Sequence, residues 1–143
     1  MAEYTMKQYK DKIDRWIKDY PKEAEKTLKT AAEIVYGEVQ KKHLSGPKMD
    51  VGEGSATHGT LQPRSGNLRS SITTKVNREG NKMEAAVGTF KRTLPYARIH
   101  EYGGIIGRRK MPERSYLRSS LKAKKRTILR MILDAIKRSY NNV

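Results

Sequence analysis

Histidine is the residue type in this sequence best suited to acid–base chemistry, and the chain has three. Acyl transfer would need His43, His58 or His100 beside a nucleophile and an orienting acid. His100 stands next to Glu101, but neighbouring residues on a helix point about 100° apart and do not face each other. Cysteine is absent, which excludes a thiol nucleophile, a disulfide and a thiolate zinc site. A histidine on a helix surface or at an interface is therefore the better interpretation of His100.

Sequence patterns for metal and phosphate sites are also missing. No Asp or Glu is followed two residues later by Lys, the offset common in metal-dependent nucleases. The glycine-rich run at 52–59 lacks the Gly-Lys-Ser/Thr ending of a phosphate-binding loop. A calcium loop starting at Asp50 would need glutamate where Leu61 stands. The sequence predicts no metal, no cofactor and no catalytic residue.

Positive charge is the strongest chemical signal in the chain. There are 31 Lys and Arg against 15 Asp and Glu, a net charge of +16, and residues 106–143 hold 12 of the basic residues but only two of the acidic ones. Aliphatic residues recur among them at helical spacing, so we expect a folded helix rather than a disordered arm. One stripe of this helix is basic and predicts contact with an acidic partner or with DNA, the alternative being a solvated face. It consists of Lys122, Arg126, Arg130 and Lys137.

Length and composition predict one α+β domain spanning residues 1–143. A chain of 143 residues is long enough for one core, and its hydrophobic fraction of 36% predicts a modest one. No apolar run approaches the roughly 18 residues of a membrane span, and the N-terminus lacks the apolar stretch of a signal peptide. We therefore expect a soluble protein without membrane contact.

The first half of the chain predicts helices followed by a loop. Residues 1–44 carry apolar faces at helical spacing, and we expect Pro21 to begin a second helix with a bend at Tyr20. A glycine-rich segment without periodicity follows, and we expect a flexible loop over residues 45–63.

The second half predicts a small antiparallel sheet and one long helix. Within residues 64–110, apolar residues alternate over 72–76 and 83–87, which predicts a hairpin turning at 78–81. A short helix over 94–102 and one further strand over 104–107 should follow. Pro112 is expected to open the basic helix of residues 111–143. The expected fold therefore has N-terminal helices and a long C-terminal helix packed on the sheet.

Four short phrases follow one another between residues 64 and 121. They are RSGNLRSSI at 64–72, VGT at 87–89, PYARIHEYGG at 95–104 and MPERSYL at 111–117. In this order and spacing they resemble the small tail-completion and head–tail joining proteins of tailed bacteriophages and prophages, similar to minor tail protein Z and the phage virion-morphogenesis group. Where those proteins usually have Arg, Pro and Phe, this chain has Arg114, Ser115 and Tyr116. The loop at 45–63 and the basic helix are not part of the shared pattern.

The resemblance implies a non-enzymatic virion structural protein that acts as a ring subunit at the neck or tail terminus, where tails are completed and joined to heads. Its partners would be copies of itself and neighbouring neck and tail proteins, in the virion and, during assembly, in the host cytoplasm. The rival hypothesis is a basic nucleic-acid-binding accessory protein that uses the C-terminal helix. The family-motif residues assigned to assembly are Gly66, Leu68, Arg69, Tyr96, His100, Glu101, Gly103, Gly104, Pro112, Arg114 and Tyr116.

Several of the motif positions also have a physical interpretation of their own. Gly66 suits a turn that opens a short helix, with Leu68 and Ile72 facing the core. Gly103 and Gly104 allow a sharp reversal of the chain. Tyr116 is either a core residue or an aromatic contact to a neighbouring subunit, and the sequence leaves both open.

Overall fold

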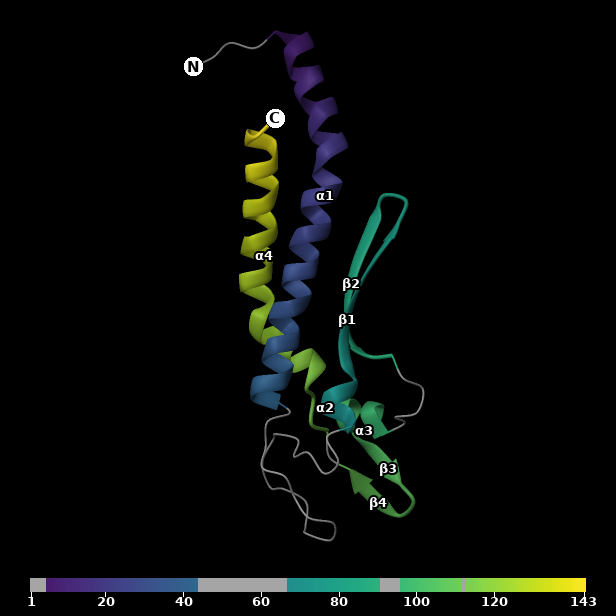
Figure 1. The fold of residues 1–143 in the computed structure, drawn as a ribbon. Coiled ribbons are helices and arrows are strands. Elements are labelled where there is room, and N and C mark those ends of the chain that lie inside the picture. The colour runs from purple at the N-terminus through teal and green to yellow at the C-terminus, as the bar shows by residue number, and fades with distance from the viewer. Residues whose placement is uncertain (1–4, 44–66, 91–95, 112) are drawn as a thin grey trace.

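The computed structural model describes residues 5–43, 67–90, 96–111 and 113–143, which form an α+β fold. Two long helices from the two ends of the chain lie side by side, and two small antiparallel sheets complete the molecule (Figure 1). The fold class predicted from the sequence is confirmed. In chain order the elements are α1 (Met6–Glu38), the π-helical turn η1 (Val39–His43), α2 (Asn67–Ser71), β1 (Ile72–Glu79), β2 (Lys82–Thr89), α3 (Tyr96–Tyr102), β3 (Gly104–Ile106), β4 (Arg109–Met111) and α4 (Leu117–Asn141).

Helix α1 runs without interruption through Pro21, so the prediction of two helices with a bend at Tyr20 is wrong. The helix starts at a capping box, in which Thr5 Oγ1 accepts from the Gln8 backbone N–H and the Gln8 side chain accepts from the Thr5 N–H. Proline inside a helix removes one backbone hydrogen bond. Contacts with α4 on both sides of Pro21, at Trp16 and at Glu38, compensate for that loss by holding both halves of α1 against the same helix.

Those contacts show that α1 and α4 are antiparallel. Near the start of α1, Trp16 Nε1 donates to Ser139 Oγ at 2.9 Å, and the indole packs edge-on against Tyr140. At its other end, the buried carboxylate of Glu38 lies 3.6 Å from Lys124 Nζ near the start of α4 and 3.3 Å from Lys42 Nζ. The described ends of the chain therefore lie at the same end of the molecule (Figure 1).

The hairpin β1–β2 packs on the side of α1 away from α4 (Figure 1). Its register pairs Thr74 with Val87 and Val76 with Ala85, so the alternating residues share the predicted inner face. The turn is the two residues between Glu79 and Lys82, where Gly80 takes φ +57°. The predicted hairpin is confirmed.

The core lies where both helices, the hairpin and α2 meet. Val35, Val39, Ile72 and Tyr116 form a buried cluster, with partly buried apolar side chains packed around it. Leu68 packs against this cluster as expected, whereas Ile72 is the first residue of β1 rather than part of the short helix. Few large side chains are fully buried among the described residues, in line with the modest hydrophobic fraction.

The strand predicted at 104–107 is confirmed as β3, but β4 was not predicted. The two strands form a second hairpin, because Gly107 at φ +60° reverses the chain and β4 pairs with β3. The predicted start of the last helix is wrong. Helix α4 begins at Leu117 and not at Pro112, because the residues before it run back over α3: the Arg114 N–H donates to the His100 carbonyl at 2.9 Å. Pro112 itself, Gly66 and the predicted loop at 45–63 lie outside the described residues.

Candidate functional site

The carboxylate of Glu101 joins the family-motif phrase in α3 to the one before α4. Glu101 is 3% exposed. Its Oε2 accepts from the backbone N–H groups of Tyr116 and Leu117, each at 2.9 Å, and its Oε1 accepts from that of Arg118 at 3.0 Å. The first turn of a helix has N–H groups without intrahelical partners, and negative charge is favoured there. A side chain from α3 therefore caps α4, which has no cap from its own Tyr116.

Two further side chains saturate the same carboxylate. Ser115 Oγ donates to Glu101 Oε1 at 2.8 Å, and Arg118 Nε donates to the same oxygen at 3.0 Å. Arg118 Nη2 also donates to the Glu101 carbonyl at 2.9 Å and to Glu113 Oε1 at 2.6 Å. The guanidinium thus ties together the end of α3, the segment before α4 and the first turn of α4.

Burial and hydrogen bonding act on Glu101 in opposite directions. Burial alone raises the pKa of a carboxylate, but hydrogen bonds from the backbone of Leu117 and Arg118, from Ser115 and from the backbone of Tyr116 favour the charged form. The donors outweigh the burial, so the pKa of Glu101 lies below its ordinary value. The carboxylate is an acceptor of fixed charge and has no role available as a general base.

Tyr116 lies in the core, which decides between the two interpretations of this aromatic side chain. It is 1% exposed, belongs to the buried cluster and donates from its hydroxyl to the Ala97 carbonyl at 3.2 Å. Burial, together with the nearby negative charge of Glu101, raises its pKa to about 12. A side chain with this environment anchors α4 on α3 and is not presented to a neighbouring subunit.

Gly103 lets the chain leave α3 against the segment that leads to α4. It has φ +71°, and its N–H donates to the Ile99 carbonyl at 2.7 Å. A Cβ at this position would lie 3.0 Å from the Glu113 backbone nitrogen and 3.2 Å from the Met111 carbonyl oxygen. Glycine therefore meets both a conformational and a steric requirement here. Gly104 follows as the first residue of β3.

The remaining motif residues are spread over the same end of the molecule. Arg69 Nε donates to Gln40 Oε1 at 2.9 Å, and Gln40 Nε2 donates to the Arg69 carbonyl at 2.8 Å, which ties α2 to η1. Tyr96 is the first residue of α3. The contacts around Glu101 therefore form a joint, in which α3, residues 113–116 and the first turn of α4 are held together. Within this joint, the residues that the sequence did not single out are Ser115 and Arg118.

The polar groups around Glu101 are taken up by contacts with one another. The buried carboxylate accepts five hydrogen bonds, and the hydroxyls of Ser115 and Tyr116 donate to that carboxylate and to the Ala97 carbonyl. Within the described ranges, no three His, Asp or Glu side chains gather as metal ligands would. None of the helices in these ranges combines the length and apolar character needed to cross a membrane.

The predicted basic stripe is separate from this joint. Lys122, Arg126 and Arg130 are exposed on α4, and so is Lys137 two turns further along. Exposed leucines interrupt the same side of the helix, among them Leu129 and Leu133. The stripe is accordingly an amphipathic surface rather than a purely charged one.

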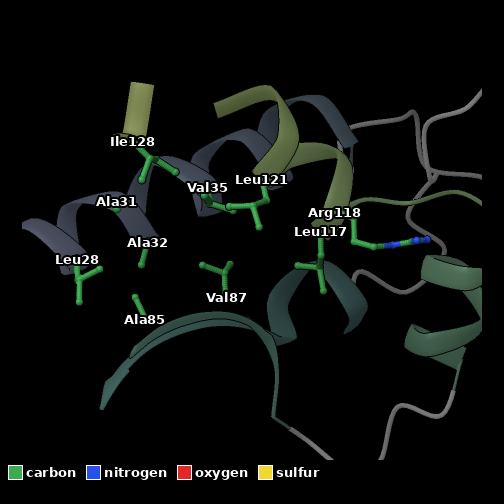
Figure 2. A pocket seen from close by; sticks show the side chains of 10 residues that line it. All are labelled: Leu28, Ala31, Ala32, Val35, Ala85, Val87, Leu117, Arg118, Leu121 and Ile128. Carbon is green, nitrogen blue, oxygen red and sulfur yellow. The ribbon is translucent and has the colours of Figure 1, made fainter. Parts of the chain in front are cut away.

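An apolar groove opens between α4 and β2, with α1 as its floor (Figure 2). Its volume is about 270 Å³. Arg118 is its one charged lining residue, and its guanidinium points away from the apolar side chains (Figure 2). Sequence reasoning missed the groove because its walls come from three distant segments. The apolar lining consists of Leu28, Ala31, Ala32 and Val35 of α1, Ala85 and Val87 of β2, and Leu117, Leu121 and Ile128 of α4.

Comparison with protein families gives a match that begins at Thr5 and ends at Gly103. Residues 5–103 match the family described as "Bacteriophage HK97-gp10, putative tail-component". No curated protein and no solved structure matches the chain at a significant level. The match covers more than half of the chain and includes the motif phrases at 64–72 and 87–89 and residues 95–103 of the phrase in α3. The chain therefore belongs to the HK97-gp10-like family of phage tail components, with a structural, non-enzymatic role in the virion.

Proposed function

We propose that this protein is a ring subunit at the neck or tail terminus, where it completes the tail and joins it to the head. The observation that carries the proposal is the family match over residues 5–103. A tail component works through contacts with other tail proteins, and a ring of identical subunits requires two different surfaces on each copy.

The hairpin supplies one surface suited to such a ring. Among the described residues β1 and β2 pair only with each other, so each strand has one edge without a strand partner. Unpaired edges are templates for a strand from a neighbouring chain. Strand addition at β1 would leave the joint around Glu101 intact, because the hairpin projects along the middle of α1 (Figure 1).

The register of the hairpin identifies a variant that blocks strand addition at β1. In a two-residue hairpin the closing pair, here Glu79 and Lys82, exchanges both hydrogen bonds, so the N–H of the neighbouring Arg78 points away from β2. Proline at position 78 removes this outward N–H without removing a hairpin bond. Arg78→Ala is the matched control, since it loses the same side chain and keeps the N–H.

The test measures assembly with purified phage tails and heads. Wild-type protein and Arg78→Ala should add to tails as a ring visible by electron microscopy and should support head–tail joining, whereas Arg78→Pro should do neither. Mass measurement of the isolated chain accompanies the assay, because a ring closed on a template can dissociate in dilution. Failure of the wild-type protein to associate with tails or heads would overturn the proposal.

A second candidate function is DNA binding through the exposed basic stripe. It is favoured by the exposure of all four side chains on one helix. Affinity for duplex DNA should then fall steeply with salt, and Arg126→Ala and Arg130→Ala should each lower the salt slope by about one. A flat salt response would exclude this function.

A further inference from the structure

The groove between α4 and β2 is part of a longer apolar surface. On α1, the groove residues Leu28 and Val35 share a helical face with Ile13 and Ile17 nearer the N-terminus, all within about 60° of arc. Ile17 is 60% exposed, and Ile13 is exposed as well. The floor of the groove therefore continues along α1 beyond the part that the hairpin covers.

Exposed leucines continue from the α4 wall around the helix. Leu121 lines the groove and is 53% exposed. Leu129 and Leu133 lie on the same i, i+4 row, which turns by about 40° at each step, so Leu129 lies about 80° and Leu133 about 120° around α4 from Leu121. Both are at least half exposed. Exposed apolar side chains therefore extend from the groove around α4, and exposed apolar surface beside a groove marks an interaction site.

Positive charge borders the α4 wall. Lys125 stands in the same row, between Leu121 and Leu129, and the adjacent row begins with Lys122 and continues with Arg126. All three cations are exposed. A partner lying against this wall meets leucine side chains and, along one flank, a line of cations.

The groove favours a helix as its occupant. Side chains of Ala85 and Val87 line the β2 wall, so the strand presents no free backbone edge to the groove (Figure 2). The other surfaces are helix faces with apolar residues at helical spacing, the arrangement that receives the apolar face of an amphipathic helix. From Leu117 to Ile128 the α4 wall is about 16 Å long at 1.5 Å per residue, which matches about three turns of a helix.

Charge decides between a second copy of this chain and a different protein. Two copies meeting at this surface would bring the same cations together, and like charges across an interface cost several kcal/mol. An occupant with carboxylates on the flank opposite Lys122 and Lys125 gains attraction instead. The net charge of +16 makes an acidic partner favourable at longer range as well.

We propose that this groove binds an amphipathic helix of another protein, with its apolar side chains in the groove and acidic side chains along the flank that faces Lys122 and Lys125. The proposal deepens the assembly role proposed above, because it names the chemistry of one tail-protein partner. The groove is a different surface from the β1 edge, so the peptide-binding proposal and the ring proposal can fail independently of each other.

A labelled peptide tests the proposal on the full chain. The probe is a fluorescein-labelled helical peptide of 20 residues with leucines on one face and glutamates on the flank, compared by anisotropy with a peptide in which every glutamate is lysine. The glutamate peptide should bind, and the lysine peptide should bind at least 10-fold more weakly. Binding by the isolated chain requires no ring, so it is measured even if head–tail joining fails.

Two pairs of variants locate the peptide on the protein. Leu121→Asp should weaken binding at least 10-fold, whereas Ile105→Asp, at a 73% exposed position on β3 away from the groove, should not change it. The double variant Lys122→Glu with Lys125→Glu should also weaken binding at least 10-fold. Lys22→Glu with Lys26→Glu alters the net charge equally on the opposite face of α1 and should have a much smaller effect.

Three results would overturn the proposal. The first is no binding of the glutamate peptide, or binding that Leu121→Asp leaves unchanged. The second is self-association of the wild-type chain that Leu121→Asp abolishes and the peptide does not compete with, since the occupant would then be a second copy. The third is displacement of the peptide by a 20-base-pair DNA duplex at equal concentration, which would mean that the cations beside the groove bind nucleic acid.

Discussion

The Glu101 carboxylate holds the joint together, because it accepts from five donors that come from two segments. Glu101→Gln keeps the shape but removes the charge and turns an NH₂ donor toward other donors. We expect the free energy of unfolding to fall by about 2–3 kcal/mol, the range for a buried charged hydrogen-bonding group that loses its match. Urea denaturation monitored by circular dichroism measures the change.

Glu113→Gln is the matched control for this variant. Glu113 also accepts from Arg118, but its carboxylate is exposed, and exposed ion pairs contribute little. Glu113→Gln should change the free energy of unfolding by no more than about 0.5 kcal/mol. Equal effects of the two variants would show that the cap on α4 does not depend on the buried carboxylate.

The direction of the Glu101 pKa shift predicts how stability depends on pH. Because the pKa in the folded state lies below the ordinary value of 4.5, the charged carboxylate stabilises the fold above pH 4.5, and this contribution is lost as the pH falls through the lower folded-state pKa. The pKa of Glu38 is lowered in the same direction. Urea midpoints between pH 7 and 3 should therefore decrease for the wild type and decrease less for Glu101→Gln. Parallel pH profiles would contradict this assignment.

At the scale of elements, helix α1 contains a proline that its packing tolerates. Replacing Pro21 with alanine restores the N–H that the Ile17 carbonyl lacks, although the unfolded chain becomes more flexible. We expect Pro21→Ala to raise the free energy of unfolding by about 1–3 kcal/mol, measured by urea denaturation. Lys22→Ala, at an exposed neighbouring position, is the control and should change it by less than about 0.5 kcal/mol. A loss of stability in Pro21→Ala would mean that the chain needs a break at this point.

Elements set by local pattern were predictable from the sequence, and those set by distant contacts were not. The β1–β2 hairpin follows from alternation over residues 72–76 and 83–87 and from a glycine turn between them. The strands β3 and β4 have three residues each, too few to show alternation. The start of α4 depends on Glu101, 16 residues before Leu117, so the nearest helix-start signal, Pro112, gave the wrong boundary.

In the candidate site too, the sequence located individual residues but not the contacts between distant segments. The motif phrases located Glu101, Gly103 and Tyr116 as important residues, but their spacing could not reveal that α3 caps α4. Arg118 escaped notice because a lone arginine in a basic helix looks like its neighbours until its partners are known. The groove depends on three segments whose proximity only the fold supplies.

At the scale of the whole molecule, a modest core carries a large positive charge. Many large apolar side chains remain exposed in the described ranges, among them Met6, Ile17, Ile105, Leu121 and Leu133. Such a chain is less stable alone than in contact with partners, because binding to the folded state stabilises it by mass action. The uneven charge acts in the same direction: repulsion along α4 opposes folding, and an acidic neighbour would relieve it.

Salt should therefore stabilise the isolated protein. Surface charges are screened within about 10 Å at 0.1 M ionic strength, so repulsion among the α4 cations weakens as salt is added, whereas the buried contacts of Glu101 are screened much less. Between 20 and 300 mM NaCl we expect the melting temperature to rise by several degrees, on the order of 1 kcal/mol. Changing Lys122, Arg126, Arg130 and Lys137 to Gln should raise stability at low salt and flatten the salt response. Changing Lys22 and Lys26 to Gln should alter the salt response less, because Asp19, Glu23 and Glu25 lie close to these lysines along α1. A melting temperature that falls as salt is added would contradict this prediction, because it would mean that attraction between surface charges outweighs repulsion in the isolated chain. An acidic partner at α4 would then gain nothing from relieving repulsion.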